Sequence, residues 1–253
     1  MRLAFPGESA EYRAARDHLL NQEIALRREM EALAAARRAL PPGGLVPQDY
    51  VFDVMGPDAT PAQVKLSDLF APDKATLIVY NMMFPRYKSD DRPQAETGPT
   101  AKLPREEGPC PSCVAFLDQL DGVVPHVEQQ LNFVVIAKTS IDRLSAFAKD
   151  RGWRHLHLLS SASNSFKRDY GAEDHEGQQM PLMNVFHRDA DGIRHFWSSE
   201  MLYAPSDPGQ DPRHMGTLEP LWNMMDFTPE GRPANWHEQL QYGCCGDMRR
   251  TKS

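Results

Sequence analysis

The chain has 253 residues, of which 25% are charged, and its formal net charge at pH 7 is −7. A general nucleic-acid-binding protein needs a basic face, so this charge balance argues against that class. We also expect no secretory signal, because the N-terminal run MRLAFPGESAEYR has no continuous apolar segment, and no membrane span, because no run reaches the roughly 18 apolar residues that a span requires.

The first predicted element is a long helix over residues 9–40. Ser9 is its candidate N-cap, and an acidic residue in the first turn suits the helix dipole. Every seventh residue is apolar, at Tyr12, Leu19, Leu26, Leu33 and Leu40. The positions between them, Ala15, Gln22, Glu29 and Ala36, are too polar for a strong coiled-coil seam. We therefore expect this helix to lie on the protein's own surface, with a homodimer contact as the alternative.

The rest of the chain alternates predicted strands and helices. In order, the patterns predict a hairpin within residues 50–66, a buried strand at 75–84, a helix at 111–130 that bends near Gly122 and Pro125, a buried strand at 131–140, an amphipathic helix at 141–153, a short strand at 155–161, a hairpin at 180–199 and a last helix at 217–227. Strand–helix–strand units imply parallel pairing with right-handed crossovers. The proline-rich loop at 85–109 is long, and such loops tend to be functional.

Two cysteines, Cys110 and Cys113, stand where that loop meets the predicted helix, in the run Gly-Pro-Cys-Pro-Ser-Cys. If the helix begins at Cys110, Pro111 takes its first position, where the missing N–H costs nothing. Unpaired amide groups and the positive end of the helix dipole then surround the Cys110 sulfur and lower its pKa. Because the thiolate is the attacking species in disulfide exchange, Cys110 is the candidate nucleophile and Cys113 the candidate resolving thiol.

Two other interpretations of this cysteine pair stay open. The thiols are either inert or half of a metal site, which needs further ligands. The only other cysteines, Cys244 and Cys245, are adjacent residues in a polar tail and make poor partners. The remaining candidate ligands are His126, His155, His157 and His175. Haem attachment is not indicated, because Val114 rather than histidine follows the pair, and we predict no cofactor. With only four cysteines, the chain is no disulfide scaffold, and we expect a protein of the reducing cytoplasm.

A Cys-x-x-Cys pair at the first strand–helix junction, followed by an antiparallel hairpin, is typical of the thioredoxin-like fold. We therefore predict an α/β protein with a central mixed sheet flanked by helices. Its parts are a helical extension (1–44), a thioredoxin-like domain (45–235) and a polar tail (236–253). In such sites a cis-proline lies against the cysteines, which predicts a cis bond before Pro181, although only about 5–6% of X-Pro bonds are cis. The alternative is an ordinary proline at the start of a strand.

The end of the strand at 75–84 supplies further candidate site residues. Tyr80, Asn81 and Phe84 face the cysteines in the predicted fold and are candidates to line the substrate pocket. The alternative is that they only cover the start of the helix.

The sequence resembles a family of bacterial thioredoxin-like proteins of unknown function that is related to peroxiredoxins. The resemblance covers about residues 9 to 235 and is most specific in the runs GPCPSC and FTPEGR. It implies a thioredoxin-like fold, with Cys110 and Cys113 as the cysteines of the motif, but no substrate. The segment after Leu40 lacks a tryptophan expected there, and residues 199–215 also depart from the family's pattern.

A peroxiredoxin function can be tested against that family's motif, Pro-x-x-x-Thr-x-x-Cys. Here Leu103 stands at the proline position and Glu107 at the threonine position. A carboxylate near Cys110 opposes thiolate formation, so peroxide reduction ranks below disulfide exchange. The sequence thus predicts a thiol–disulfide oxidoreductase acting on an unknown disulfide or thiol, with a non-enzymatic binding module or a metal-binding protein as alternatives. We expect no nucleic-acid or membrane partner.

Overall fold

A computed structural model of the chain describes residues 3–211, 213 and 218–228. The chain divides into two units, Met1–Gly43 and Gly44–Ser253. The first unit contains the predicted long helix, α1, at Ala10–Arg38. The side chain of Ser9 caps this helix by accepting a hydrogen bond from the Tyr12 N–H at 3.0 Å. None of the residues of α1, all of which are described, is buried.

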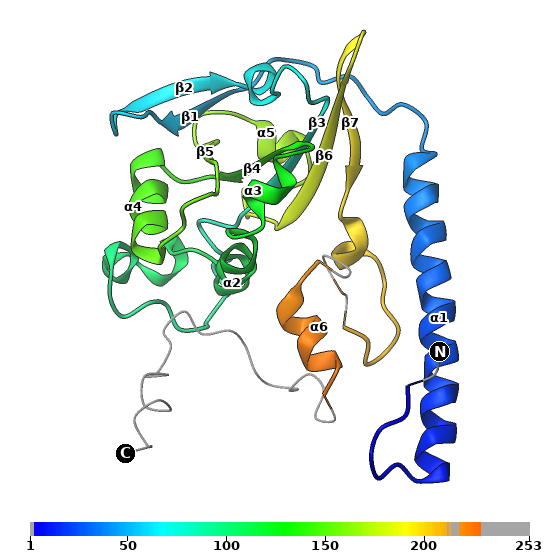
Figure 1. The fold of residues 1–253 in the computed structure, drawn as a ribbon. Coiled ribbons are helices and arrows are strands. Elements are labelled where there is room, and N and C mark those ends of the chain that lie inside the picture. Colours follow the sequence, from blue (N-terminus) through cyan, green and yellow to red (C-terminus); the bar gives the residue numbers. More distant parts are fainter. Residues whose placement is uncertain (1–2, 212, 214–217, 229–253) are drawn as a thin grey trace. The chain divides into compact units, whose positions relative to one another are not determined.

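The second unit contains all the strands of the described structure, and Figure 1 labels its main elements. Its β-strands are β1 (Val51–Met55), β2 (Pro61–Lys65), β3 (Thr76–Asn81), β4 (Asn132–Ala137), β5 (Leu158–Ser160), β6 (Leu182–Asp189) and β7 (Gly192–Ser198). Its α-helices are α2 (Pro111–Leu120), α3 (Val124–Val127), α4 (Ile141–Arg151), α5 (Phe166–Asp169) and α6 (Pro220–Asp226). Four 3₁₀ turns are η1 (Leu66–Leu69), η2 (Pro99–Lys102), η3 (Arg105–Glu107) and η4 (Glu200–Tyr203). The predicted tail at 236–253 lies outside the described residues.

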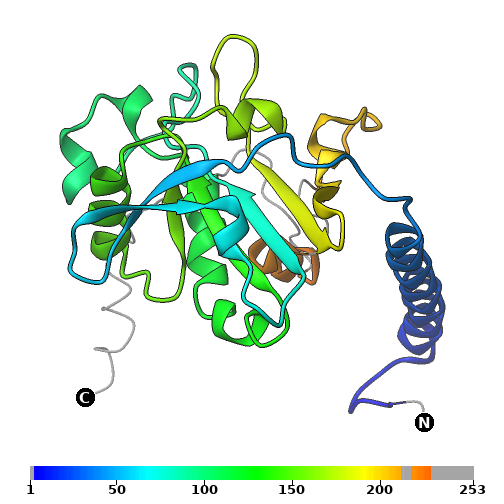
Figure 2. The same ribbon diagram turned by 90° about the horizontal axis from the view of Figure 1, so that it is seen from above.

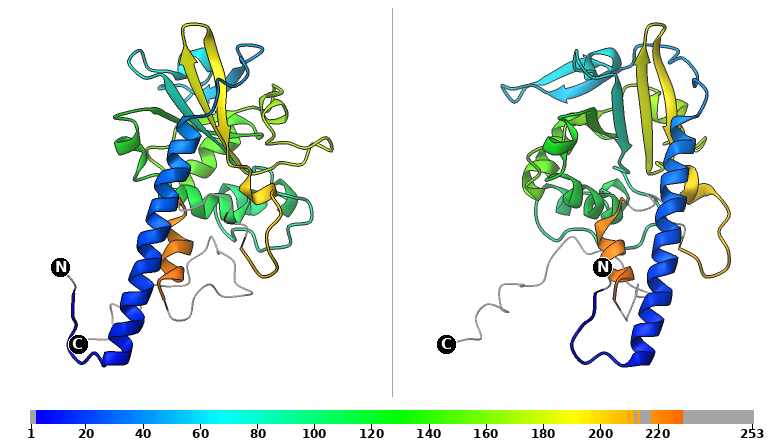
Figure 3. Two further views of the ribbon diagram at one scale, coloured as in Figure 1. Left: turned by 90° about the vertical axis from the view of Figure 1, so that its right-hand side faces the viewer. Right: turned by 45° about the vertical axis from the view of Figure 1, so that its right-hand side comes forward.

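The strands form one mixed sheet in the order β2-β1-β5-β4-β3-β6-β7. Strand β4 pairs in parallel with β3 and β5, and the other pairs are antiparallel. The hairpins β1–β2 and β6–β7 form the two ends of this sheet (Figure 3). Part of this sheet is built from a β3–α2–β4 unit and the later β6–β7 hairpin, whose strands lie in the order β4-β3-β6-β7. This order and these connections define a thioredoxin-like fold, which confirms the predicted fold class.

Helices cover both faces of the sheet because its central strands are apolar on both sides. In β4, Phe133 and Val135 pack into one apolar cluster, whereas Val134 and Ile136 pack into the other. The first cluster takes residues from α2, α3 and α4, and the second takes Phe166 of α5. Figure 2 shows the three green helices on one side of the sheet and α5 on the other. A buried strand of this kind is what the continuous apolar run predicted.

Two aspartates at the C-terminal end of α2 fix that helix against the following elements. Asp118 accepts hydrogen bonds from Arg151 Nε at 2.9 Å and from Trp153 Nε1 at 2.7 Å. Asp121 accepts from the backbone N–H groups of residues 154–156, at 2.9 to 3.2 Å. The predicted bend near Gly122 is the break between α2 and α3. With its far end held in this way, α2 presents its N-terminus at a defined place beside β3.

Candidate functional site: two thiols at the start of helix α2

The chain after β3 holds the first cysteine in place. The backbone N–H of Met82 donates to Ile136 O at 2.9 Å, and the N–H of Cys110 donates to Met83 O, also at 2.9 Å. Cys110 is the N-cap residue of α2, with an extended backbone, and Pro111 takes the first helical position. The structure therefore places the Cys110 side chain at the start of the helix, as predicted. The end of β3 and the helix start meet in one place, through backbone hydrogen bonds that do not depend on side chains.

Both thiols are free and almost completely buried, with relative exposures of 1% for Cys110 and 2% for Cys113. A hydrogen bond from the Cys113 thiol is the main reason that the pKa of Cys110 falls to about 7. The backbone amide of Cys113 and the charge of Arg92 also lower it, and burial opposes them. Burial, followed by the neighbouring Cys110, raises the pKa of Cys113 well above its ordinary value. At neutral pH, Cys110 therefore ionises readily and Cys113 keeps its proton.

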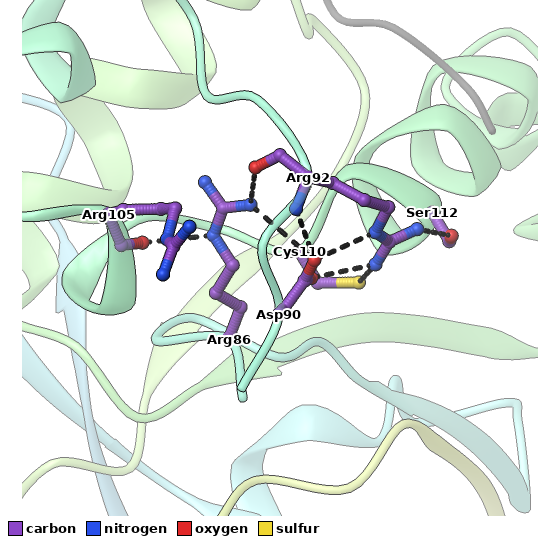
Figure 4. Close-up of polar contacts among 6 residues, drawn as sticks. All are labelled: Arg86, Asp90, Arg92, Arg105, Cys110 and Ser112. Atoms are coloured by element: carbon purple, nitrogen blue, oxygen red, sulfur yellow. Dashed lines mark hydrogen bonds and ion pairs between the residues drawn. The ribbon is translucent and has the colours of Figure 1, made fainter. Parts of the chain in front are cut away.

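Arg92 is the charged neighbour of the Cys110 sulfur, and Figure 4 shows it reaching that sulfur from the loop at 85–109. Its Nη2 lies 3.4 Å from Cys110 Sγ, and its Nη1 donates to Ser112 Oγ at 2.7 Å. The carboxylate of Asp90 accepts from Arg92 Nε at 2.9 Å and from Nη2 at 2.8 Å. Arg92 is thus held by Asp90 in a position where its positive charge stabilises a thiolate at Cys110.

A second arginine, Arg86, holds the same loop together from inside (Figure 4). It is 3% exposed, and it donates from Nε to the carbonyl oxygen of Arg105 at 2.9 Å and from Nη1 to that of Arg92 at 2.8 Å. Its Nη1 also lies 3.8 Å from Asp90. Because a buried guanidinium with carbonyl acceptors is costly to displace, Arg86 gives the Asp90–Arg92 segment a fixed conformation over the cysteines.

Glu107 does not act as predicted from its place in the motif. Its carboxylate lies 3.3 Å from Nη1 of Arg143 on α4, and both side chains are partly exposed. The charge expected to oppose the Cys110 thiolate is therefore paired with a cation. The residue whose charge lowers the pKa of Cys110 is Arg92, 18 positions before it, and nothing in the sequence beyond the length of the loop indicated it.

The predicted pocket residues divide into two groups. Tyr80 is buried in the same apolar cluster as the two cysteines, and a hydrogen bond from its side chain lowers the pKa of Cys113. Phe84 shares the apolar cluster of the cysteines, where its ring packs against Phe147 with centroids 5.7 Å apart. Asn81 instead ties β3 to β6, donating to Leu182 O at 3.0 Å and Asn184 Oδ1 at 2.6 Å. Tyr80 therefore contacts the dithiol, Phe84 is part of the surrounding core, and Asn81 is a structural link within the sheet.

The prediction of a cis peptide bond before Pro181 is wrong. In the described part of the chain the cis bond is Phe84–Pro85, and Met180–Pro181 is trans. Pro181 directly precedes β6, and its carbonyl oxygen accepts from Tyr203 Oη at 2.8 Å. The trans form is the ordinary state of an X-Pro bond, and the fold analogy gave too much weight to the alternative.

A metal centre finds no support within residues 3–211, 213 and 218–228, where no group of three or more His, Cys, Asp or Glu side chains is placed to hold an ion. His157, one of the candidate ligands, lies 3.0 Å from Glu128 on the surface. Cys244 and Cys245 lie outside the described residues. In the same part of the chain, no helix is long and apolar enough to cross a bilayer.

The fold and the paired thiols define the class of this protein, a thioredoxin-like protein with a buried dithiol at a helix start. Its family is the one described as bacterial protein of unknown function, DUF899, to which the chain belongs over residues 3–244. The chain matches no curated protein.

Several solved structures are similar to the chain at low identity. A reduced 2-Cys peroxiredoxin of Plasmodium vivax is 16% identical, with a TM-score of 0.41, over 62% of this chain and 82% of that chain. Peroxidoxin BcpB of Mycobacterium tuberculosis is 18% identical, with a TM-score of 0.39, over 71% and 94%. Thioredoxin peroxidase I of Plasmodium yoelii is 18% identical, with a TM-score of 0.39, over 79% and 100%. The fold assignment rests on the strand order and connections described above.

Proposed function

We propose that this protein is a cytoplasmic thiol–disulfide oxidoreductase, and that the run from Gly108 to Cys113 is the functional motif of its family. One observation carries the proposal. The Cys110 sulfur lies at a helix start, 3.4 Å from a guanidinium nitrogen of Arg92, with the Cys113 thiol as its hydrogen-bond donor. This arrangement supplies a nucleophilic thiolate and a second thiol within reach of it.

The proposed reaction has two exchange steps. The Cys110 thiolate attacks one sulfur of a substrate disulfide, forming a mixed disulfide and releasing the first substrate thiolate. Cys113 then loses its proton and attacks the Cys110 sulfur, which forms the Cys110–Cys113 disulfide and releases the second substrate thiolate. The substrate gains two electrons and the protein loses two. An external dithiol returns the protein to its reduced form.

The substrate must reach a sulfur that is almost fully covered. Because Cys110 is 1% exposed and the Arg92 side chain contacts its sulfur, exchange requires that side chain to move away from the start of α2. The same burial is the observation that favours the second candidate function, a thioredoxin-like binding module whose thiols take no part in chemistry.

The two candidates differ in whether the pair forms a disulfide. We would treat the reduced protein, with Cys244 and Cys245 replaced by serine, with oxidised glutathione and measure its mass after alkylation. The oxidoreductase is expected to lose two hydrogen atoms reversibly, from peptides containing Cys110 and Cys113, as glutathione disulfide is reduced to two glutathione thiols. The Cys113→Ser variant is expected to keep a glutathione adduct on Cys110, because no resolving thiol is present. Thiols that stay reduced under excess oxidant would establish the binding module instead, and stoichiometric zinc lost on Cys110→Ser would establish a metal site.

A further inference from the structure

A buried lysine reaches the segment between β3 and the dithiol from an element that no sequence motif connects with the cysteines. Lys167 belongs to the short helix α5 and is 1% exposed. Its Nζ donates a hydrogen bond to the carbonyl oxygen of Met82 at 2.7 Å. Burial lowers the pKa of this amine to about 7. A lysine of this kind changes its charge near neutral pH, which is unusual for the residue type.

The hydrogen bond of Lys167 ends on the same peptide group that contacts Cys113. The carbonyl of Met82 accepts from Lys167, and the backbone of Met83, whose N–H belongs to that same planar unit, lowers the pKa of Cys113 by hydrogen bonding. Resonance couples the carbonyl and the N–H of one peptide bond. A cation on the carbonyl side therefore makes the N–H a stronger donor, and this strengthens its bond to a thiolate.

The charged and titratable groups around the two residues are few. Charges on Cys113 and Glu173 raise the pKa of Lys167, and the charge on Lys138 lowers it. Glu173 forms an ion pair with Lys138. The pKa of Cys113 is shifted by Cys110 and Tyr80. A charge on Cys113 in turn raises the pKa values of Tyr87, Tyr203 and Lys167. Since the carboxylate of Glu173 is paired with Lys138, Lys167 is available as a cation to balance a negative charge on Cys113.

We propose that Lys167 is a positioning residue for the resolving step, binding a proton as Cys113 loses one and stabilising the Cys113 thiolate through the Met82–Met83 peptide. This inference rests on the proposed function and names the group that makes its second step feasible. Before resolution, the buried pair is a thiol and a neutral amine. When the thiolate attacks the mixed disulfide, the amine is an ammonium, so the buried site carries no net charge at either stage. As the new disulfide forms, the released substrate thiolate takes up the proton and Lys167 becomes neutral again.

The first test measures the pKa of Cys113 when it is the only cysteine. In a background of Cys110→Ser with Cys244 and Cys245 also replaced by serine, ultraviolet thiolate absorbance is followed against pH. Lys167→Met is expected to raise the Cys113 pKa by about one unit or more, a tenfold or greater loss of thiolate at a given pH. The matched control is Lys149→Met on α4, an exposed lysine, which is expected to leave the titration unchanged. Identical titrations for the two variants would overturn the proposal.

The second test uses a folded protein that keeps Lys167, so it does not depend on the stability of the Lys167→Met variant. The NMR shift of the Lys167 ε-carbon reports its titration with Cys113 present and with Cys113→Ser. Because Cys113 ionises well above the pH at which Lys167 titrates, coupling predicts that part of the Lys167 titration moves to the higher pH of Cys113 ionisation, as a second step that is absent from Cys113→Ser. A single, identical step in both proteins would refute the coupling. Neither test needs Cys110 or a disulfide, so a failure of disulfide formation counts against the proposed function alone.

Discussion

The ionisation of Cys110 is set by groups that act against its burial. The Cys113 thiol contributes most to the lowered pKa, and the charge of Arg92 adds to it across a 3.4 Å contact. The free amide groups of the helix start also lower it, through the backbone N–H of Cys113, whose effect is smaller than that of the thiol. The reactivity of this cysteine is therefore a property of three residues together, and each can be changed separately.

Arg92→Met is expected to raise the pKa of Cys110 from about 7 toward its ordinary value, because a cation in contact with the sulfur is removed. A shift of about one unit lowers the thiolate fraction about tenfold at pH values well below the original pKa. The measurement is thiolate absorbance against pH with Cys244 and Cys245 replaced by serine. Absorbance is preferred to alkylation rate because Arg92 also covers the sulfur, so its loss changes access as well as charge.

Two variants of the same loop serve as controls for Arg92→Met. Arg105 is exposed and contributes only its carbonyl oxygen to the network, and Glu107 is paired with Arg143. Neither Arg105→Met nor Glu107→Gln is expected to move the Cys110 titration. If Arg92→Met gives the same midpoint as Arg105→Met, Arg92 has no part in stabilising the thiolate.

Some residues of the site can be predicted from the sequence, and others cannot. Pro111 and the spacing of the cysteines define a helix start through local geometry alone, and Cys110 lies there. Arg92 and Lys167 reach the thiols only through the folding of a loop and through a short helix that follows β5. No local pattern encodes such contacts, so side chains that determine the charge of the site are the ones that sequence reasoning missed.

Among the elements, those with strong periodicity were predicted to within a few residues. Strand β3 lies within the predicted 75–84, and α4 within 141–153. The order of strands across the sheet was harder to predict from the sequence. Strand β5 pairs with β1 through Val54 and Leu159, about a hundred positions apart in the chain. Such pairing depends on how the whole sheet assembles rather than on the alternation of either strand.

The apolar residues of helix α1 are not buried, so the surface that covers them must be sought elsewhere. Leu26 and Leu33 are 60% and 54% exposed, one heptad apart on the same side of the helix. The sequence pattern favoured a helix on the protein's own surface, with a homodimer as the alternative; we propose that alternative, in which a second copy of the chain covers this stripe. Leu26→Lys with Leu33→Lys is then expected to weaken dimerisation at least about tenfold, or about 1.4 kcal/mol.

Sedimentation equilibrium over a range of concentrations measures this dimerisation directly, against a chain mass of 28.6 kDa. Glu31→Lys provides the matched control, since it lies on α1 away from the leucine stripe and is exposed. It is expected to dimerise as the original protein does. An original protein that stays monomeric at every concentration would show that the stripe has another function.

The burial of Lys167 is a consequence of the assembly of the whole sheet. Phe166, its neighbour on α5, packs into one apolar cluster, while the Lys167 amine reaches the carbonyl of Met82 just beyond β3. The run Ser165–Asp169 contains two basic residues and by itself predicts a solvated turn. A fold that keeps such a lysine accepts a stability cost at neutral pH.

That cost has a predictable dependence on pH. The Lys167 pKa is about 7 in the folded protein and about 10.4 in an unfolded chain. Between these values the unfolded state binds more protons, so the free energy of unfolding rises with pH, by at most about 1.4 kcal/mol per unit for one group. Below about pH 7 the lysine is charged in both states, and the cost of burial is present in full. Cys110, whose pKa is also lowered, contributes a rise of the same sign in any variant that retains it.

Lys167→Met is therefore expected to flatten the pH dependence of stability by roughly 1 kcal/mol per unit between about pH 7 and about pH 10. Urea unfolding at several pH values, with Lys149→Met as the surface control, measures the two slopes. The absolute stability of the variant is a poorer readout, because Met cannot donate to the Met82 carbonyl and that loss is the same at every pH. The slope reports only the proton that the buried amine gains on unfolding. Parallel curves for Lys167→Met and Lys149→Met would mean that the buried lysine keeps its charge in the folded protein, and the resolving step would then need no proton at Lys167.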